Sequence, residues 1–310
     1  MAVTDEGPSR TWLEVDAAVQ AALDNGLPVV ALESTLISHG LPYPRNLEVA
    51  HMLEETARES GAVPATIAAL SGVFRVGLGA DELVRLARGG VRKVSRRDMP
   101  IVAAQGGDGA TTVAATMVVA AAAGIRVFAT GGIGGVHRGQ PFDVSADLQE
   151  LARSPVVVVC AGAKAILDLP LTLEWLETRG VPVLGYGTDT FPAFYTRSSG
   201  LPVDARVDGP QEVVAVFRAQ RAMGLAGGML VAVPVPAADA LPEHEVEGTI
   251  EAALRDAASE GVKGSRITPY LLGRLASLTK GRSVETNVAL LRNNVRVAAA
   301  VAGVLCRPAR

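Results

Sequence analysis

In Pro155-Val-Val-Val-Val-Cys160, four consecutive valines stand between a proline and the small residues Ala161-Gly-Ala163. An unbroken apolar run of this length, bounded by turn residues, is typical of a strand that is buried on both faces of a parallel sheet. Lys164 follows the small residues directly. The stretch therefore predicts a central strand that carries a lysine just beyond its carboxyl end.

Short apolar runs alternate with helical patterns from about residue 28 to about residue 235. We expect strands at Pro28–Leu32, Ala65–Leu70, Ile101–Ala104, Arg126–Ala129, Val156–Cys160, Val181–Gly185 and Gly228–Val233. We expect helices at Asn46–Glu59, Thr111–Ala123, Leu171–Thr178 and Gln211–Met223. Such alternation predicts an α/β fold in which a mostly parallel sheet is sandwiched by helices (α/β/α).

After Pro236 the pattern becomes entirely helical, and we expect a helical C-terminal layer at residues 236–310. Gly261 and Gly281 fit the ends of its helices. We expect these helices at Glu243–Glu260, Pro269–Thr279 and Ser283–Val301. A separate C-terminal subdomain is the alternative. Because no linker or internal repeat divides the chain, residues 1–310 are expected to form a single domain, with residues 1–10 disordered.

The composition narrows the class of protein. The chain has 310 residues, 49% of them hydrophobic, and a net charge of −3, so it lacks the basic surface that nucleic-acid binding requires. No apolar run reaches the roughly 18 residues of a membrane span without Gly, Pro or a charge. The polar N-terminus is unlike a secretory signal, and Cys160 and Cys306 are too few for a disulfide framework. We therefore expect a cytoplasmic enzyme that binds neither nucleic acid nor membrane.

Two ionisable residues at strand ends are candidates for catalysis. At the end of a buried strand, desolvation disfavours the ammonium form of Lys164 and makes it an amine nucleophile toward a carbonyl carbon. The alternative is a lysine whose stem packs on the strand while its ammonium reaches solvent. Glu33 interrupts an apolar run, so desolvation raises its pKa toward the range of a general acid. The alternative is a glutamate that pairs with a nearby arginine or leaves the crevice altogether.

Ligands of open α/β sheets bind beyond the carboxyl ends of the strands, so we expect the segments there to converge on one crevice. Gly109-Ala-Thr-Thr112 opens an alanine-rich helix whose amides and hydroxyls suit a phosphate, although ordinary threonine capping is the alternative. Gly131–Gly135 does not complete the dinucleotide-binding fingerprint. The expected crevice segments are Glu33-Ser-Thr35, Gly106–Thr112, Thr130–Arg138 and Lys164.

Two further segments carry clustered charges. Phe142-Asp-Val-Ser-Ala-Asp147 forms a loop before an expected helix at Leu148–Arg153, where one aspartate could bind Mn²⁺ or Mg²⁺ through water and the other could cap the helix. Lys93-Val-Ser-Arg-Arg-Asp98 could bind phosphate or carboxylate, or form a solvated charged surface. Among the histidines, His137 lies on the glycine-rich loop, whereas His39 and His51 carry little information.

Several motifs, taken in order, resemble one family over about Gly26 to Val301. They are Ala31–Gly40, Lys93–Asp98, Gly109–Met117, Ala129–Gly139, Phe142–Leu148 and Cys160–Lys164. The chain closely resembles the pseudouridine-5′-phosphate glycosidases, a family that also includes the indigoidine-synthase A-like proteins. The resemblance implies reversible cleavage of pseudouridine 5′-phosphate to uracil and ribose 5-phosphate. It also implies a divalent metal, usually manganese, and a homotrimer.

Carried over residue by residue, the resemblance implies that Lys164 is the nucleophile and Glu33 the proton donor. A C–C glycosidic bond has no easily protonated oxygen, so an imine between Lys164 and the ring-opened sugar is a better route than two-carboxylate hydrolysis. Asp143 resembles the metal ligand, acting mostly through water. The positions that resemble substrate contacts are Lys93, Thr112, Val113, His137, Ser145, Ala146, Asp147 and Asn287.

The chain departs from the family pattern at two places, and two rival functions stay open. The loop from Arg138 to Phe142 is shorter than usual, and Gln105-Gly-Gly-Asp108 replaces a lysine–asparagine type of pair. A class I aldolase-like lyase acting on a phosphorylated sugar would also use a strand-end lysine. A non-catalytic, nucleotide-binding accessory protein is the other alternative, and the intact pair of Glu33 and Lys164 argues against it.

Overall fold

A large, mostly parallel sheet forms the centre of the computed structural model, which describes residues 12–262 and 267–307. The expectation that residues 1–10 are disordered therefore falls outside the described residues. The strands of this sheet are β1 (Leu13–Val15), β2 (Val29–Glu33), β3 (Val63–Leu70), β4 (Val73–Val76), β5 (Arg92–Val94), β6 (Gly109–Thr111), β7 (Val127–Ala129), β10 (Val157–Cys160), β12 (Val183–Tyr186), β13 (Ala205–Val207) and β14 (Met229–Ala232).

The strand order is β1-β4-β3-β2-β7-β10-β14-β12-β13, and β6 pairs with both β3 and β5. Only the pairs that β3 makes with β4 and β6 are antiparallel. The valine-rich strand β10 lies between β7 and β14, and each of its residues has 0% exposed surface. The predicted central, doubly buried strand is confirmed.

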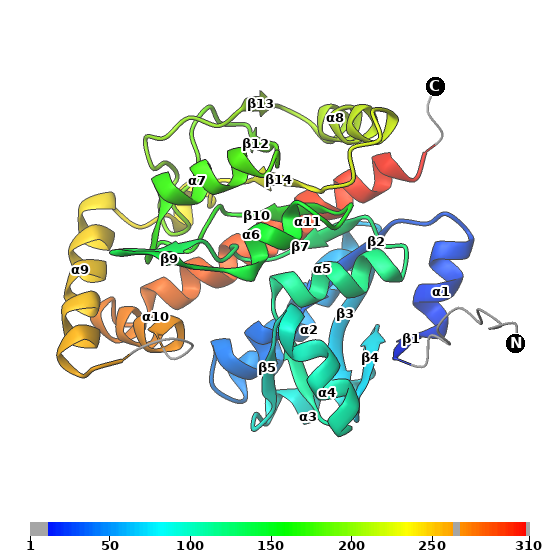
Figure 1. Cartoon of the computed structure of the whole chain (residues 1–310), viewed down its shortest axis with the longest axis horizontal. Coiled ribbons are helices and arrows are strands. Elements are labelled where there is room, and N and C mark those ends of the chain that lie inside the picture. The colour runs from blue at the N-terminus through cyan, green and yellow to red at the C-terminus, as the bar shows by residue number, and fades with distance from the viewer. Residues whose placement is uncertain (1–11, 263–266, 308–310) are drawn as a thin grey trace, which may run out of the picture.

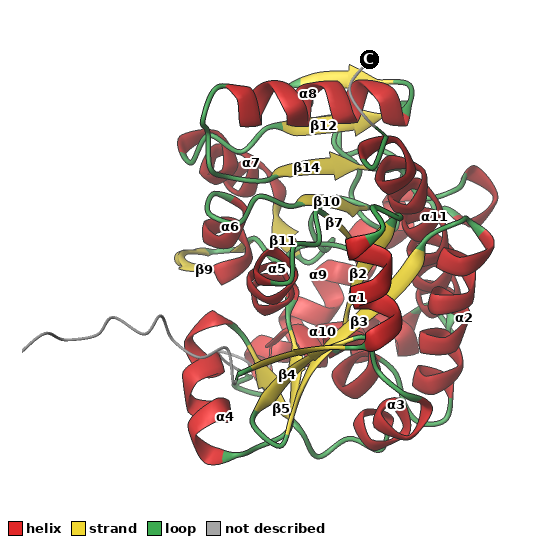
Figure 2. Cartoon of the chain, turned by 90° about the vertical axis from the view of Figure 1, so that its right-hand side faces the viewer, coloured by secondary structure: helices red, strands yellow, loops and turns green. Residues whose placement is uncertain are grey.

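Helices cover both faces of the sheet, with α5, α6 and α7 on one side and α2 and α11 on the other (Figure 2). The predicted α/β/α arrangement is thus confirmed. The helices before residue 236 are α1 (Ala17–Asp24), α2 (Arg45–Glu59), α3 (Ala80–Ala87), α4 (Met99–Gln105), α5 (Val113–Ala122), α6 (Ala146–Leu151), α7 (Leu169–Thr178) and α8 (Pro210–Ala222). Short helical turns occur at η1 (Leu36–Gly40), η2 (Arg96–Asp98) and η3 (Ala237–Asp239).

One expected strand is wrong, because Ile101–Ala104 lies inside helix α4. The local signals for this helix are a capping box between Ser95 and Asp98, a proline in its first turn, and Gly106 in the left-handed conformation (φ 63°) at its end. These signals outweigh four apolar residues in a row. The segment Gly106–Thr112 therefore does not follow a strand, and it enters the sheet as β6 itself.

After Pro236 the described elements are all helical, which confirms the expected C-terminal layer. They are η3, α9 (Glu243–Ser259), α10 (Ile267–Leu278) and α11 (Arg282–Leu305). Helix α11 is long and apolar enough to cross a membrane by length and composition. It packs against β2, β7 and β10, and it buries Leu290, Asn294 and Val295. It is therefore a core helix of this fold, with α9 and α10 packed together near its start (Figure 1).

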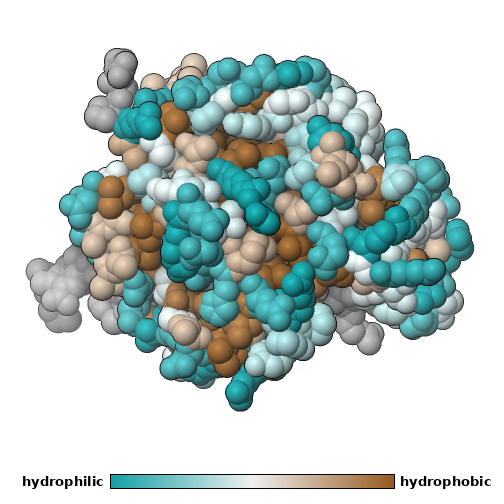
Figure 3. Space-filling view, turned by 180° about the vertical axis from the view of Figure 1, so that it is seen from behind, coloured by the Kyte–Doolittle hydropathy of each residue, from teal (hydrophilic) through white to brown (hydrophobic). Residues whose placement is uncertain are grey.

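A small antiparallel sheet, in the order β11-β8-β9, lies beside the large one. Its strands are β8 (Val136–His137), β9 (Gln140–Val144) and β11 (Leu167–Asp168). The expected loop at Phe142–Asp147 is therefore partly strand, and α6 begins at Ala146, two residues before the expected Leu148. Phe142 on β9 is 99% exposed. Elsewhere hydrophilic and hydrophobic side chains are interspersed, as on the face shown in Figure 3.

Candidate active site

Lys164 is positioned by pairing between the loops that follow β7 and β10. The amide of Ala161 donates to the carbonyl of Gly131 (2.8 Å), and the amide of Lys164 donates to the carbonyl of Ile133 (3.1 Å). Ile133 in turn donates to the carbonyl of Gly162 (3.0 Å). These bonds continue the parallel pairing of the two strands beyond their ends. The glycine-rich loop and the lysine loop therefore lie side by side.

The small residues before Lys164 are required by close packing. Gly162 has a φ of +85°, and a Cβ atom there would lie 2.3 Å from the carbonyl oxygen of Pro192. Only glycine adopts this conformation without strain and leaves that space free. A Cβ atom on Gly134 would similarly lie 2.2 Å from Oγ of Ser145. Backbone segments thus approach one another closely around the lysine.

Glu33, the last residue of β2, is held by a chain of two hydrogen bonds. Oγ1 of Thr130 donates to Oε1 of Glu33 (2.5 Å), and Nδ2 of Asn294 donates to the carbonyl of Thr130 (2.9 Å). Asn294 lies on α11 and is fully buried. Through these bonds the core helix α11 fixes Thr130, and Thr130 orients the carboxyl group.

Burial raises the pKa of Glu33, although the charge of Lys164 and the hydrogen bond from Thr130 act in the opposite direction. The carboxyl group therefore keeps its proton to a higher pH than an exposed glutamate, as a general acid requires. The direction predicted from the strand end is confirmed. The alternative of a paired glutamate is wrong, because among the ion pairs of residues 12–262 and 267–307 none joins Glu33 to an arginine.

A cavity of about 230 Å³ brings four of the predicted residues together: Glu33, Lys93, Lys164 and Asn287. Burial, followed by the nearby charge of Lys164, lowers the pKa of Lys93, whereas Asp147 and Glu33 oppose this shift. Much of the remaining wall is apolar and comes from η1, α10, α11 and the loop after β12. Its side chains include Leu36, Leu41, Phe194, Tyr195, Leu272 and Leu291. The lining of the cavity therefore has a charged part, which includes Glu33, Lys93 and Lys164, and an apolar part.

Asp147 serves the architecture of the site rather than lining this cavity. Its Oδ1 accepts from the amide of Ala114 (2.8 Å) and its Oδ2 from the amide of Gly134 (2.8 Å), and only 5% of the residue is exposed. The carboxylate therefore ties the start of α5 to the glycine-rich loop. Its negative charge also acts on Glu33 and Lys93.

Asp147→Asn should destabilise the protein, because the amide nitrogen that replaces one oxygen cannot accept from a backbone N–H group. A buried N–H group left without a partner costs about 1–3 kcal/mol, which should appear in the free energy of unfolding by urea. Asp168→Asn is the matched control. Asp168 caps α7 through an exposed bond to the amide of Leu171 (3.0 Å), and asparagine caps helices about as well as aspartate. Equal stability of the two variants would contradict this role of Asp147.

The neighbouring substrate candidates cluster at the starts of α5 and α6, which pack together, but outside the cavity lining. Thr112 caps α5 by accepting from the amide of Ala115 (3.4 Å), so the capping alternative does occur. Val113 follows it and is buried. Ser145 caps α6, accepting from the amide of Asp147 (3.3 Å), and Ala146 is exposed. Their contact with substrate stays a prediction.

His137 and Asp143 also lie outside the lining of the cavity. His137 is on β8, paired with Leu167 of β11, and Asp143 is on β9. Both residues are half-buried. The described residues contain no group of three or more His, Cys, Asp and Glu side chains that could hold a metal. A metal at Asp143 would therefore take most of its ligands from water.

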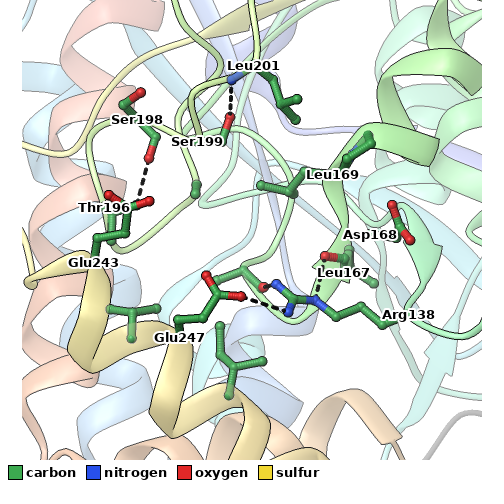
Figure 4. Close-up of a pocket in the computed structure, with 15 residues that line it drawn as sticks. Arg138, Leu167, Asp168, Leu169, Thr196, Ser198, Ser199, Leu201, Glu243 and Glu247 are labelled. Carbon is green, nitrogen blue, oxygen red and sulfur yellow. Dashed lines mark hydrogen bonds and ion pairs between the residues drawn. The ribbon is translucent and has the colours of Figure 1, made fainter.

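Arg138 joins the lysine loop to α9 beside a second cavity of about 440 Å³ (Figure 4). Its guanidinium donates to the carbonyls of Ala165 and Leu167, each at 3.1 Å, and pairs with Glu247 of α9 at 3.5 Å. The two carbonyls belong to the segment directly after Lys164. Arg138 therefore restrains the segment that follows Lys164 from the side of this second cavity.

Several residues that line the cavity or hold Glu33 in place were not predicted from sequence. Thr130 had a signal, because it stands first in a strand-end segment. Phe194 had none, since its φ of +64° is rare for a residue with a side chain and cannot be read from sequence. His39 was set aside, yet it lines the cavity. The sequence carries no signal for Asn294, because nothing in the pattern of α11 distinguishes it from the other polar residues of that helix.

Comparisons with known proteins identify relatives that cover nearly the whole chain. Residues 18–304 match the family described as "Indigoidine synthase A like protein". The chain is 59% identical over 297 residues to the pseudouridine-5′-phosphate glycosidase of Chloroflexus aurantiacus, covering 94% of this chain and 97% of the relative. It is 55% identical over 293 residues to the protein of the same name in Solibacter usitatus, covering 94% and 98%.

Two solved structures share the fold. One is the prealnumycin C-glycosynthase AlnA in complex with ribulose 5-phosphate (TM-score 0.89, 40% identity, 96% of this chain and 97% of the other). The other is an indigoidine synthase A-like protein from Thermotoga maritima (TM-score 0.88, 37% identity, 96% and 98%). Family, relatives and structures agree over nearly the whole length. The chain therefore belongs to the family of indigoidine synthase A-like proteins.

Proposed function

We propose that this chain is an enzyme that reversibly cleaves the bond between C1′ of the ribose and C5 of the uracil in pseudouridine 5′-phosphate. The products are uracil and ribose 5-phosphate. The observation that carries this proposal is the shared cavity of Glu33 and Lys164, in which burial raises the pKa of a carboxyl group that lies in the same cavity as an amine. The names of the relatives and the pentulose phosphate bound to AlnA point to the same substrate class.

In the proposed mechanism, the amine of Lys164 bonds to C1′ as the C1′–O4′ bond breaks, which opens the sugar, and the proton lost by the amine leaves O4′ as a hydroxyl group. When the C1′–C5 bond breaks, its electron pair stays with C5 of uracil, and the protonated imine of Lys164 forms at C1′. Glu33 donates the proton that C5 requires. Water then hydrolyses the imine, which releases ribose 5-phosphate and restores the amine. Overall one water molecule is consumed in cleavage and released in synthesis.

The phosphate can bind beside the start of α5, where Thr112 caps the helix and the positive end of the helix dipole favours anions. Lys93 on β5 pairs in register with Ala110, two residues before Thr112. We propose that these groups bind the phosphate, with Ser145-Ala-Asp147 alongside and His137 and Asn287 contacting the sugar or base.

The direct test is incubation of the protein with uracil and ribose 5-phosphate, followed by ultraviolet absorbance and identification of the product. We expect pseudouridine 5′-phosphate to form. Activity on a phosphorylated ketose or deoxysugar, with none on the C-nucleotide, would favour the aldolase-like alternative. Nucleotide binding without any turnover would favour the accessory protein.

A divalent cation, Mn²⁺ in our proposal, fits near Asp143 only if water supplies most of its ligands, as hard cations of this kind allow. When bound, it would supply positive charge. We expect Asp143→Ala to lose Mn²⁺, measured as metal bound per subunit after dialysis, and chelation to remove most activity. Asp168→Asn should keep the metal. If Asp143→Ala retains both the metal and the rate, the metal assignment is wrong.

We also propose a cytoplasmic homotrimer, and light scattering coupled to size exclusion should give three times the subunit mass of 32.0 kDa. The almost fully exposed phenyl group of Phe142, on edge strand β9, is a candidate contact between subunits. Phe142→Ser should then shift the measured mass toward that of one subunit, whereas Met223→Ser, at another exposed apolar residue, should not. A parent protein with the mass of one subunit would contradict the trimer.

A further inference from the structure

His39 presents an unused hydrogen-bonding atom to the cavity. Its Nε2 is buried and has no hydrogen-bond partner among the described residues. The same side chain lines the cavity together with Glu33, Lys93 and Lys164. Native structures leave few buried polar atoms unpaired, because each one loses its bond to water without replacement. An unpaired nitrogen in the wall of a ligand cavity is therefore best explained by a bond to the ligand.

The position of His39 is built into the fold. It lies in η1, a single π-helical turn that begins three residues after Glu33, and such turns are frequent at functional sites. Two hydrogen bonds hold this turn against neighbouring helices. Ser38 Oγ donates to the carbonyl of Leu86 on α3 (3.0 Å), and Asn46 Nδ2 of α2 donates to the carbonyl of Ile37 (2.6 Å). The ring itself bonds the backbone of Val91, and this bond uses Nδ1 because Nε2 has no partner.

The protonation state determines what the free nitrogen can bind. Burial, together with the positive charge of Lys93, lowers the pKa of His39. A neutral imidazole that donates through Nδ1 has a lone pair on Nε2 and is an acceptor there. Its ligand must therefore be an O–H or N–H donor. A phosphate dianion has no proton to donate, so it does not match this atom.

We propose that Nε2 of His39 accepts a hydrogen bond from the bound substrate and thereby positions it against Lys164 and Glu33. This proposal rests on the proposed function. That substrate offers two sources of the required donor, the hydroxyl groups of the sugar and the N–H groups of uracil. Neither the proposed proton transfer nor the imine involves His39, so its contribution is to binding.

Two substitutions separate the substrate contact from the bond to Val91. In His39→Asn, the side-chain amide can still donate to Val91 but has no atom at the place of Nε2. In His39→Gln, the longer side chain places an amide oxygen near Nε2. We expect His39→Asn to raise the KM for one substrate of the synthetic reaction about ten-fold, the scale of one lost hydrogen bond, with kcat changed less. His39→Gln should remain within about three-fold of the parent enzyme.

The KM values identify the donor. A rise in the KM for uracil assigns the contact to the base, and a rise in the KM for ribose 5-phosphate assigns it to the sugar. The proposal is overturned if His39→Asn leaves both KM values unchanged, or if His39→Gln is impaired more than His39→Asn, since the bond to Val91 would then be the important one. A parent protein that does not turn over these substrates would count against the proposed function itself.

Discussion

Lys164→Ala should abolish turnover, with a loss of about 10⁴-fold or more, as is typical when a covalent nucleophile is removed. The expected reason is that the other amine known to line the cavity, that of Lys93, is assigned to the phosphate and does not form the bond to C1′. Borohydride should trap the imine of the parent enzyme with ribose 5-phosphate. The peptide that carries Lys164 should then gain the mass of one sugar phosphate.

Lys93→Ala is the matched control, because Lys93 lies in the same cavity. It should weaken binding of the sugar phosphate, yet Lys164 should still be trapped by borohydride at high sugar concentration. Labelling of Lys93 instead of Lys164, or undiminished turnover in Lys164→Ala, would assign the nucleophile elsewhere.

The second large effect is expected for Glu33→Gln, which keeps the size of the side chain but cannot donate the proton. Removing a general acid typically costs 10²–10⁴-fold in rate, and we expect a loss on this order. Trapping of Lys164 by borohydride with ribose 5-phosphate should be preserved, since this imine forms directly from the sugar phosphate without any proton transfer at C5. A Glu33→Gln enzyme within a few-fold of the parent would show that Glu33 is structural.

The pH dependence gives a sharper test of the same residue. Because burial raises the pKa of Glu33, the rate of cleavage of pseudouridine 5′-phosphate should fall as the pH rises through that pKa and the acid loses its proton. Thr130→Val removes the hydrogen bond to Oε1, which holds this pKa down. The fall in rate should therefore move to higher pH in Thr130→Val and disappear in Glu33→Gln. A profile unchanged by Thr130→Val would contradict the assignment.

Segments with strong local patterns were predictable. The valine run of β10 has no alternative as a surface strand, and the alternation of strands and helices implies parallel pairing. Parallel pairing in turn places the ends of β2 and β10 at the same edge, which is why Glu33 and Lys164 could be predicted to meet. The strand expected at Ile101–Ala104 failed because four apolar residues fit a short helix as well as a strand, and capping decided between them.

By itself, then, the sequence determined the α/β/α class, the buried strand and the two strand-end residues, because these depend on local periodicity and on the direction of the chain. Only the tertiary structure decided the surroundings of Glu33. Thr130 bonds it from 97 residues away, and Asn294 holds Thr130 from 164 residues away. It also gave Asp147 two bonds to backbone amides and brought His39 to the cavity. Such contacts join segments distant in sequence, and their hydrogen bonds depend on exact distances that no local pattern encodes.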